Sequence, residues 1–172
     1  MRRRGPFFIV LFLWWPLALL EGCGGGGSPP PPLQPSARVV VGDYNLAFKS
    51  VYAGYLSADN TLGIFMIQDP QTSQSPYPFA TVSVEGASAL QVGTPADCGV
   101  AVVIAEDISF ASGTEWPGEP DPISSVTFSR LELTAGGRVS GSVTGTAMRP
   151  EDPQPSPVGL SCSFKDVPVI VQ

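Results

Sequence analysis

Hydrophobic and polar residues alternate through most of the chain after Arg38, which is the pattern of β-strands with one buried face. The clearest case is the segment 138–148, where small and apolar residues fall on one side and hydroxyl residues on the other. Because a shift of one residue would bury four hydroxyl groups, this alternation predicts the register of the strand. We expect Val139, Val143 and Ala147 to be buried, Gly141 and Gly145 to lie under a close neighbour, and Ser140, Ser142, Thr144 and Thr146 to be exposed.

The same pattern predicts about seven strands, separated by turn residues. Hairpins are expected around the polar cluster 57–60 and around the glycine turn 135–137. In the last strand the buried phase changes between Phe164 and Val167, which indicates a β-bulge at Lys165 and Asp166. The expected strands are 44–56, 62–68, 79–85, 100–110, 126–134, 138–148 and 160–169.

Composition supports an all-β domain. The chain contains 19 glycines and 19 prolines in 172 residues, which requires frequent turns and disfavours a helical bundle. No convincing helical pattern follows Leu20. We therefore predict an antiparallel β-sandwich or a partly closed β-barrel over residues 38–172.

The first 22 residues predict a signal peptide. Three arginines, Arg2 to Arg4, precede an apolar run over residues 7–20 that Pro16 interrupts. As a helix this run would rise about 21 Å, less than the roughly 30 Å of a bilayer core. Export is therefore favoured over a permanent membrane span.

Leu20, Gly22 and Cys23 close this run, and the segment resembles the lipobox of bacterial lipoproteins, although Glu21 departs from the small or apolar residue usual at its position. The resemblance implies diacylglyceration of the Cys23 thiol, cleavage just before Cys23 and acylation of the new amino terminus with a fatty acid such as palmitate. In Gram-negative members of this class, an Asp after the cysteine favours retention in the inner membrane. Gly24 at that position implies the outer membrane, on its periplasmic or surface side.

Residues 23–37 read as a tether. Four glycines and Ser28 predict a flexible coil, and Pro29 to Pro32 predict an extended spacer. Neither segment can bury enough apolar surface to fold. The expected organisation is a signal peptide over 1–22, a lipidated linker over 23–37 and an all-β domain over 38–172, held in the cell envelope through its lipid anchor.

Charge and composition exclude several activities. The chain contains no histidine, which removes Ser-His-Asp and Cys-His catalysis and zinc sites with histidine ligands. Its net charge of −6 argues against nucleic acid as a partner. Neither a G-x-S-x-G nor an S-x-x-K motif occurs, so we predict no catalytic residue and no cofactor.

If Cys23 carries lipid, Cys98 and Cys162 remain as an even pair in an exported chain. We therefore expect a disulfide between them, which would stabilise the domain by about 4 kcal/mol in the chain-entropy model. The alternative is two buried free thiols.

Two kinds of candidate site lie in the predicted loops. Trp116 and Tyr77 could each provide a stacking surface for a sugar or a protein, or could fold back over the end of the sandwich. Acidic loops can bind calcium but are most often only solvated, and no EF-hand spacing occurs. The acidic candidates are Glu106, Asp107, Glu115, Glu119 and Asp121.

Two function classes follow. The preferred one is a non-catalytic, membrane-anchored lipoprotein that binds an envelope protein or glycan or has a structural role. The alternative is a small carboxylate-dependent envelope hydrolase, such as a glycosidase, which needs two carboxylates about 5–10 Å apart in a concave pocket. A flat or convex aromatic patch would favour binding.

Overall fold

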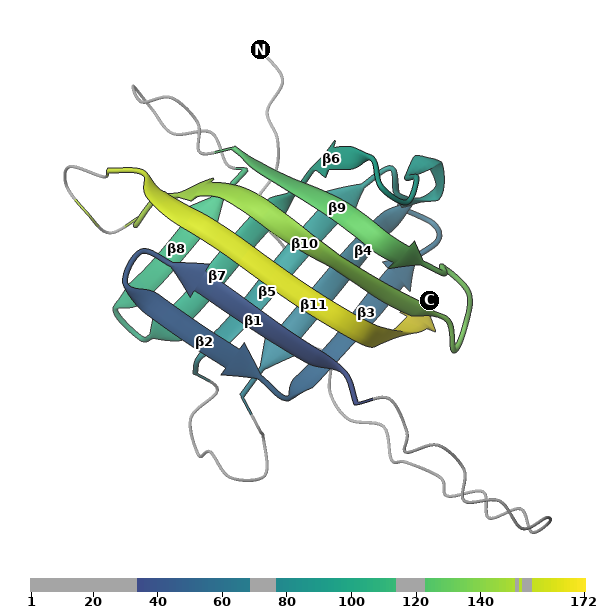
Figure 1. Cartoon of the computed structure of the whole chain (residues 1–172), viewed down its shortest axis with the longest axis horizontal. Helices are drawn as coiled ribbons and strands as arrows, with labels where there is room; N and C mark the ends of the chain where they lie inside the picture. Colours follow the sequence, from purple (N-terminus) through teal and green to yellow (C-terminus); the bar gives the residue numbers. More distant parts are fainter. Residues whose placement is uncertain (1–33, 69–76, 114–122, 151, 153–155) are drawn as a thin grey trace, which may run out of the picture. The chain divides into compact units, whose positions relative to one another are not determined.

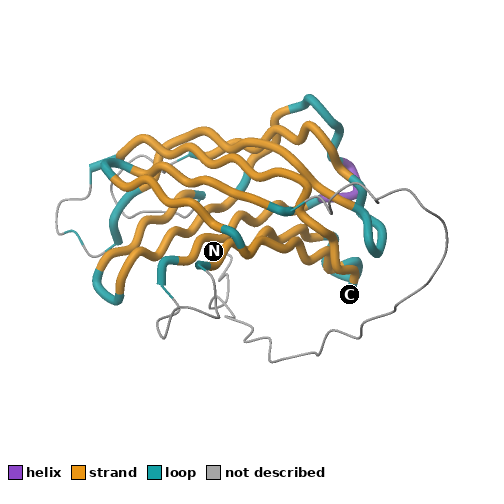
Figure 2. Tube along the Cα trace, turned by 60° about the horizontal axis from the view of Figure 1, so that its bottom comes forward, coloured by secondary structure: helices purple, strands orange, loops and turns teal. Residues whose placement is uncertain are grey.

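A computed structural model describes residues 34–68, 77–113, 123–150, 152 and 156–172. The folded unit spans Leu33–Gln172, and its first strand begins at Ser36. Figure 2 shows that strands make up most of the described chain. The elements are β1 (Ser36–Val41), β2 (Tyr44–Phe48), β3 (Ser50–Leu56), β4 (Thr61–Ile67), β5 (Phe79–Glu85), the 3₁₀ turn η1 (Ala87–Ala89), β6 (Pro95–Asp97), β7 (Gly99–Ala105), β8 (Ile108–Ser112), β9 (Ser124–Leu131), β10 (Arg138–Ala147) and β11 (Val158–Val171).

The strands form two layers that share β11 (Figure 1). Sheet A has the order β2-β1-β11-β10-β9-β6, and all its pairings are antiparallel. Sheet B has the order β3-β4-β5-β7-β8. The last residues of β11 pair with β3 in parallel, and a bridge between Ala111 and Met148 joins β8 to the end of β10. The layers are thus connected at two places, as in a partly closed barrel.

The predicted all-β fold is confirmed, with more strands than expected. Segment 44–56 forms two strands, because the strand is interrupted at Lys49, where the chain passes from sheet A to sheet B. Segment 100–110 also forms two, with a turn at Glu106 and Asp107. Both breaks lie inside continuous β-rich sequence, so the alternation of apolar and polar residues did not reveal them. β6 has only three residues, which is too few to show such an alternation.

The register of β10 agrees with the prediction at all but one position. Val139, Val143 and Ala147 are buried, and Ser142, Thr144 and Thr146 are exposed. A Cβ atom at Gly141 would lie 2.6 Å from the carbonyl oxygen of Thr127 in β9, so the expected close neighbour is the backbone of that strand. Ser140 was expected outside but is 8% exposed.

The burial of Ser140 follows from the predicted bulge in β11, which is confirmed. Pairing with β10 shifts between Val139, opposite Val167, and Gly141, opposite Phe164. Asp166 takes a left-handed backbone conformation, with φ at 52°. Its N–H donates to Ser140 Oγ at 2.8 Å, so this buried hydroxyl has a partner and its burial cost is offset.

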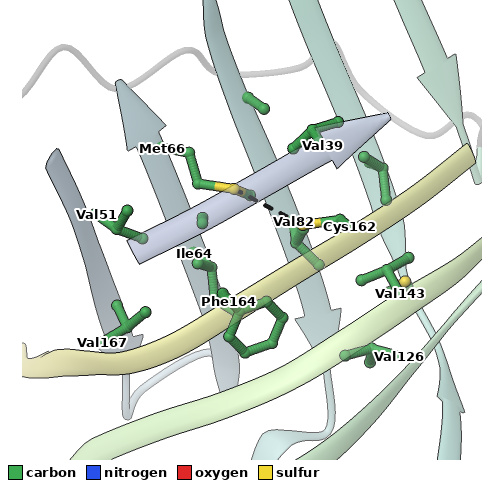
Figure 3. Close-up of a cluster of buried hydrophobic side chains, with 14 of the residues drawn as sticks. Val39, Val51, Ile64, Met66, Val82, Val126, Val143, Cys162, Phe164 and Val167 are labelled. Atoms are coloured by element: carbon green, nitrogen blue, oxygen red, sulfur yellow. Dashed lines mark hydrogen bonds between the residues drawn. The ribbon is translucent and has the colours of Figure 1, made fainter. Parts of the chain in front are cut away.

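Side chains from both layers meet in one core (Figure 3). Cys162 of β11 lies against Met66 of β4, with the two sulfur atoms 3.8 Å apart. Cys98 and Cys162 are both buried free thiols, so the predicted disulfide is not formed and the alternative applies. In sheet A, β9 and β10 lie between β6, which ends just before Cys98, and β11, which contains Cys162, so the two cysteines do not lie on paired strands. Burial raises the pKa of each thiol to about 12.

A network of hydrogen bonds and ion pairs surrounds Asp166 at the bulge of β11. Arg138 Nη1 donates to the Asp166 carbonyl oxygen at 2.6 Å, and Arg130 Nη1 lies 3.4 Å from Asp166 Oδ1. Arg130 also donates two hydrogen bonds to the Glu132 carboxylate, which accepts a third from the N–H of Arg138. These donors, with the Arg130 side chain first, hold the pKa of Glu132 below its usual value of 4.5.

The register of β10 predicts opposite effects at adjacent residues. Val143→Asp should unfold the domain, because an unpaired buried charge costs several kcal/mol against a total stability of about 5–15 kcal/mol. Thr144→Asp should change the melting temperature little, since that side chain is exposed. Thermal unfolding followed by circular dichroism measures both, and a tolerated aspartate at Val143 would show that the opposite face is the core.

The network around Glu132 predicts an acid-sensitive contribution to stability. Its folded pKa is lower than its unfolded pKa, so the contribution is present above pH 4.5 and is lost as pH falls through the folded value. We expect Glu132→Gln to lower the melting temperature at neutral pH. The difference between wild type and variant should shrink steadily below pH 4.5, and a constant difference down to pH 2 would contradict this role.

Candidate binding surface

The outer face of sheet B carries a row of large apolar side chains. In β4, Leu62, Ile64 and Met66 point into the core, and the alternate residues Phe65 and Ile67 point outward. A strand that is apolar on both faces and buried on only one must leave an apolar surface to solvent. Register places Phe65 between Tyr52 and Thr81, and Ile67 between Ser50 and Phe79.

The aromatic rings on this face form two stacked pairs. The ring centroids of Tyr52 and Phe65 lie 5.1 Å apart with an interplanar angle of 16°, and those of Tyr77 and Phe79 lie 5.9 Å apart at 20°. Both members of the first pair remain accessible, at 37% and 36% exposure. We name the outward-facing set Tyr52, Phe65, Ile67, Tyr77 and Phe79 the aromatic face.

Local sequence explains how the first pair is held. A Cβ atom at Gly63 would lie 3.0 Å from the Phe65 ring, so glycine at this position makes room for the ring against the sheet. Partial burial by these neighbours raises the pKa of Tyr52 above its usual value. Its phenol therefore remains neutral and able to donate a hydrogen bond at neutral pH.

The residues that share cross-strand rows with the aromatic face are apolar or neutral. Leu56 and Ile170 are also exposed, and Ile170 lies opposite Gly54, next to Tyr52 along β3. Two cross-strand rows contain four of the five residues of the aromatic face, and none of their members is charged. One row is Ser50, Ile67, Phe79, Val103 and Ser109, and the other is Tyr52, Phe65, Thr81, Ala101 and Ala111.

Of the two predicted aromatic candidates, Tyr77 belongs to this face, half-buried and stacked on Phe79. Trp116 lies outside the described residues. Sequence reasoning missed Tyr52 and Phe65, although a signal for them existed. The segment 62–67 is apolar at every position except Gly63, which a strand with one solvated face would not be.

The acidic candidates do not come together as a calcium site among the described residues. Glu106 and Asp107 form the exposed turn between β7 and β8, while Glu115, Glu119 and Asp121 lie outside the described part. Arg149 Nη2 donates to the Asp107 carbonyl oxygen at 3.4 Å, and a guanidinium beside this turn opposes a second cation there. Within the described ranges, no three Asp, Glu or Cys side chains are grouped as metal ligands would be.

Two open depressions also lack the groups for hydrolysis. One, of about 400 Å³, lies on the outer face of sheet A and is lined by Val40, Gly42, Thr144, Gly145, Gly159, Leu160 and Ser161. The other, of about 390 Å³, is lined by Ala89, Leu90, Gln91, Thr94, Pro95 and Ala96. Neither lining includes a carboxylate, so neither offers the carboxylate pair of a glycosidase.

Cys23 and the whole 1–33 segment lie outside the described residues, so the fold does not test the lipobox. In the part that is described, no helix has the length and apolar character needed to cross a membrane. Comparison with protein-family models, curated proteins and solved structures finds no match to this chain.

Proposed function

We propose that this protein is an exported, lipid-anchored and non-catalytic binding module that presents the aromatic face to a glycan of the cell envelope. The single observation that carries the proposal is the uncharged, solvent-accessible pair of stacked rings, Tyr52 and Phe65, on the outside of sheet B. Exposed apolar surfaces of this kind on soluble domains mark interaction sites.

The chemistry of the face suits a sugar chain. A pyranose ring has an apolar C–H face that packs on an aromatic ring and hydroxyl groups around its edge. The aromatic face offers rings for the first, and the hydroxyls of Ser50 and Thr81 in the same rows offer partners for the second. Because the face carries no charge, it favours a neutral segment of a glycan over an anionic one.

The absence of carboxylates from the two cross-strand rows favours binding over hydrolysis. Glycoside hydrolysis needs an acid and a second carboxylate on either side of the scissile bond. Both cross-strand rows of the face are free of Asp and Glu. A ligand that stacks on Tyr52 and Phe65 therefore meets no catalytic pair in these rows.

The proposed anchor is supported by the first 36 residues alone. The basic start, the short apolar run, the lipobox-like Leu20 to Cys23 and the glycine and proline tether occur in the order that a lipoprotein requires. Two or three acyl chains on Cys23 would anchor the protein stably, since each buried methylene contributes about 0.8 kcal/mol.

The aromatic face predicts which residues bind. The double variant Tyr52→Ala and Phe65→Ala should reduce retention on purified envelope polysaccharides at least about tenfold, because stacked aromatic residues dominate such contacts. Retention on an array of these polysaccharides and isothermal titration calorimetry with the best binder would measure the loss. Ser161→Ala, on the outer face of sheet A, is the matched control. Unchanged binding by a folded double variant would exclude the aromatic face, and capture of a protein instead would replace the glycan as partner.

The anchor predicts the first residue of the mature protein. Intact-mass and peptide analysis should find an acylated Cys23 at the amino terminus. Cys23→Ala should leave the precursor uncut in the membrane fraction, because the processing that the lipobox implies acts only on the acylated cysteine. A wild-type product that begins at any other residue would refute the lipoprotein assignment.

A further inference from the structure

Three basic side chains gather where the tether enters the folded domain. In sheet A, Ser36 of β1 pairs with Lys165 of β11, and Lys49 lies in the bend directly after β2, whose last residue, Phe48, pairs with Ala37 next to Ser36. Arg38 lies two residues further along β1 and points to the same side. All three basic residues are exposed, and we name Arg38, Lys49 and Lys165 the basic corner. The start of β1 and the end of β2 lie side by side in Figure 1.

The basic corner concentrates a charge that is scarce elsewhere. Lys49 and Lys165 are the only two lysines of the chain, and six basic residues against fourteen acidic ones follow residue 22. Arg130 forms ion pairs with Glu132 and Asp166, Arg138 donates to the Asp166 carbonyl, and Arg149 donates to the Asp107 carbonyl. In the corner, Arg38 Nε donates to the neutral amide oxygen of Asn45 at 2.8 Å, which leaves the guanidinium charge without an acidic partner. Within the described residues, no ion pair involves a member of the basic corner.

We propose that the basic corner rests on anionic lipid headgroups of the membrane that holds the anchor, an inference that depends on the proposed lipidation of Cys23. Cys23 precedes Ser36 by thirteen residues, which reach at most about 45 Å when fully extended. The tether therefore keeps the corner near the bilayer at high effective concentration. Three cations near an anionic surface each add a favourable contribution there.

The acidic charge of the rest of the domain means that the contact at the basic corner would decide how the domain is oriented on the membrane. The domain as a whole is acidic and is repelled by an anionic surface, while charges beyond about 8 Å are screened at physiological salt. The orientation with the corner against the headgroups is favoured because it places these three cations at the anionic surface. Arg38 and Lys165 lie on the outer face of sheet A, whereas Tyr52 and Phe65 lie on the outer face of sheet B, so contact through Arg38 and Lys165 leaves the stacked rings accessible.

Amine acetylation of the two lysines tests the contact directly. The full mature chain is coupled through Cys23 to a maleimide lipid and inserted into vesicles of phosphatidylcholine, with or without phosphatidylglycerol. We expect Lys49 and Lys165 to be acetylated about fivefold more slowly on the anionic vesicles, with the protection lost in high salt. A lysine introduced by Gln91→Lys, exposed near β6 at the opposite edge of sheet A, should react equally on both.

A charge reversal beside the reporters sharpens the test. Arg38→Glu should reduce the protection of both lysines, whereas Gln91→Glu should leave it unchanged. Equal acetylation rates on the two vesicle types, with the protein still floating with the vesicles, would overturn the proposal. Since the lipid is attached chemically, that result would not bear on whether cells acylate Cys23, which the first residue of the native protein decides separately.

Discussion

The fold depends on one irregularity in its longest strand. Up to Phe164, β11 pairs with strands of sheet A and buries alternate side chains in the core. From Val167 it buries the residues of the opposite phase and pairs with β3 in sheet B. The extra residue at Asp166 makes this change of phase possible, because it rotates the strand by one position. Without it, either Phe164 or Val167 would face water.

The charged groups around the bulge make it stable. A left-handed backbone at a residue other than glycine is unfavourable, and a buried carboxylate is costly without partners. The N–H of Asp166 donates to Ser140 Oγ, its carbonyl oxygen accepts a hydrogen bond from Arg138, and its carboxylate forms an ion pair with Arg130. Three residues that are distant in sequence thus compensate one unfavourable conformation, and the two layers close around the core as a result.

Once the layers are joined, their outer faces acquire different chemistry. Sheet A exposes serine and threonine from β10 and β11, with the basic corner at one edge. Sheet B exposes the stacked rings of Tyr52 and Phe65. In the function that we propose, a tethered domain uses the first face toward the membrane and the second toward its ligand. The strand register, by deciding which residues point outward, separates these two roles.

The sequence by itself determined the all-β class, the hairpins, most of the β10 register and the bulge in β11, because alternation over five or more residues records local burial. Tertiary structure decided the rest. Strand order and the passage of β11 between layers are long-range pairings that leave no local period, and the same pairings put Cys98 and Cys162 on strands that are not neighbours. The aromatic face and the basic corner join residues from different strands. Their side chains become neighbours only when the sheets form, so no local pattern could have placed them together.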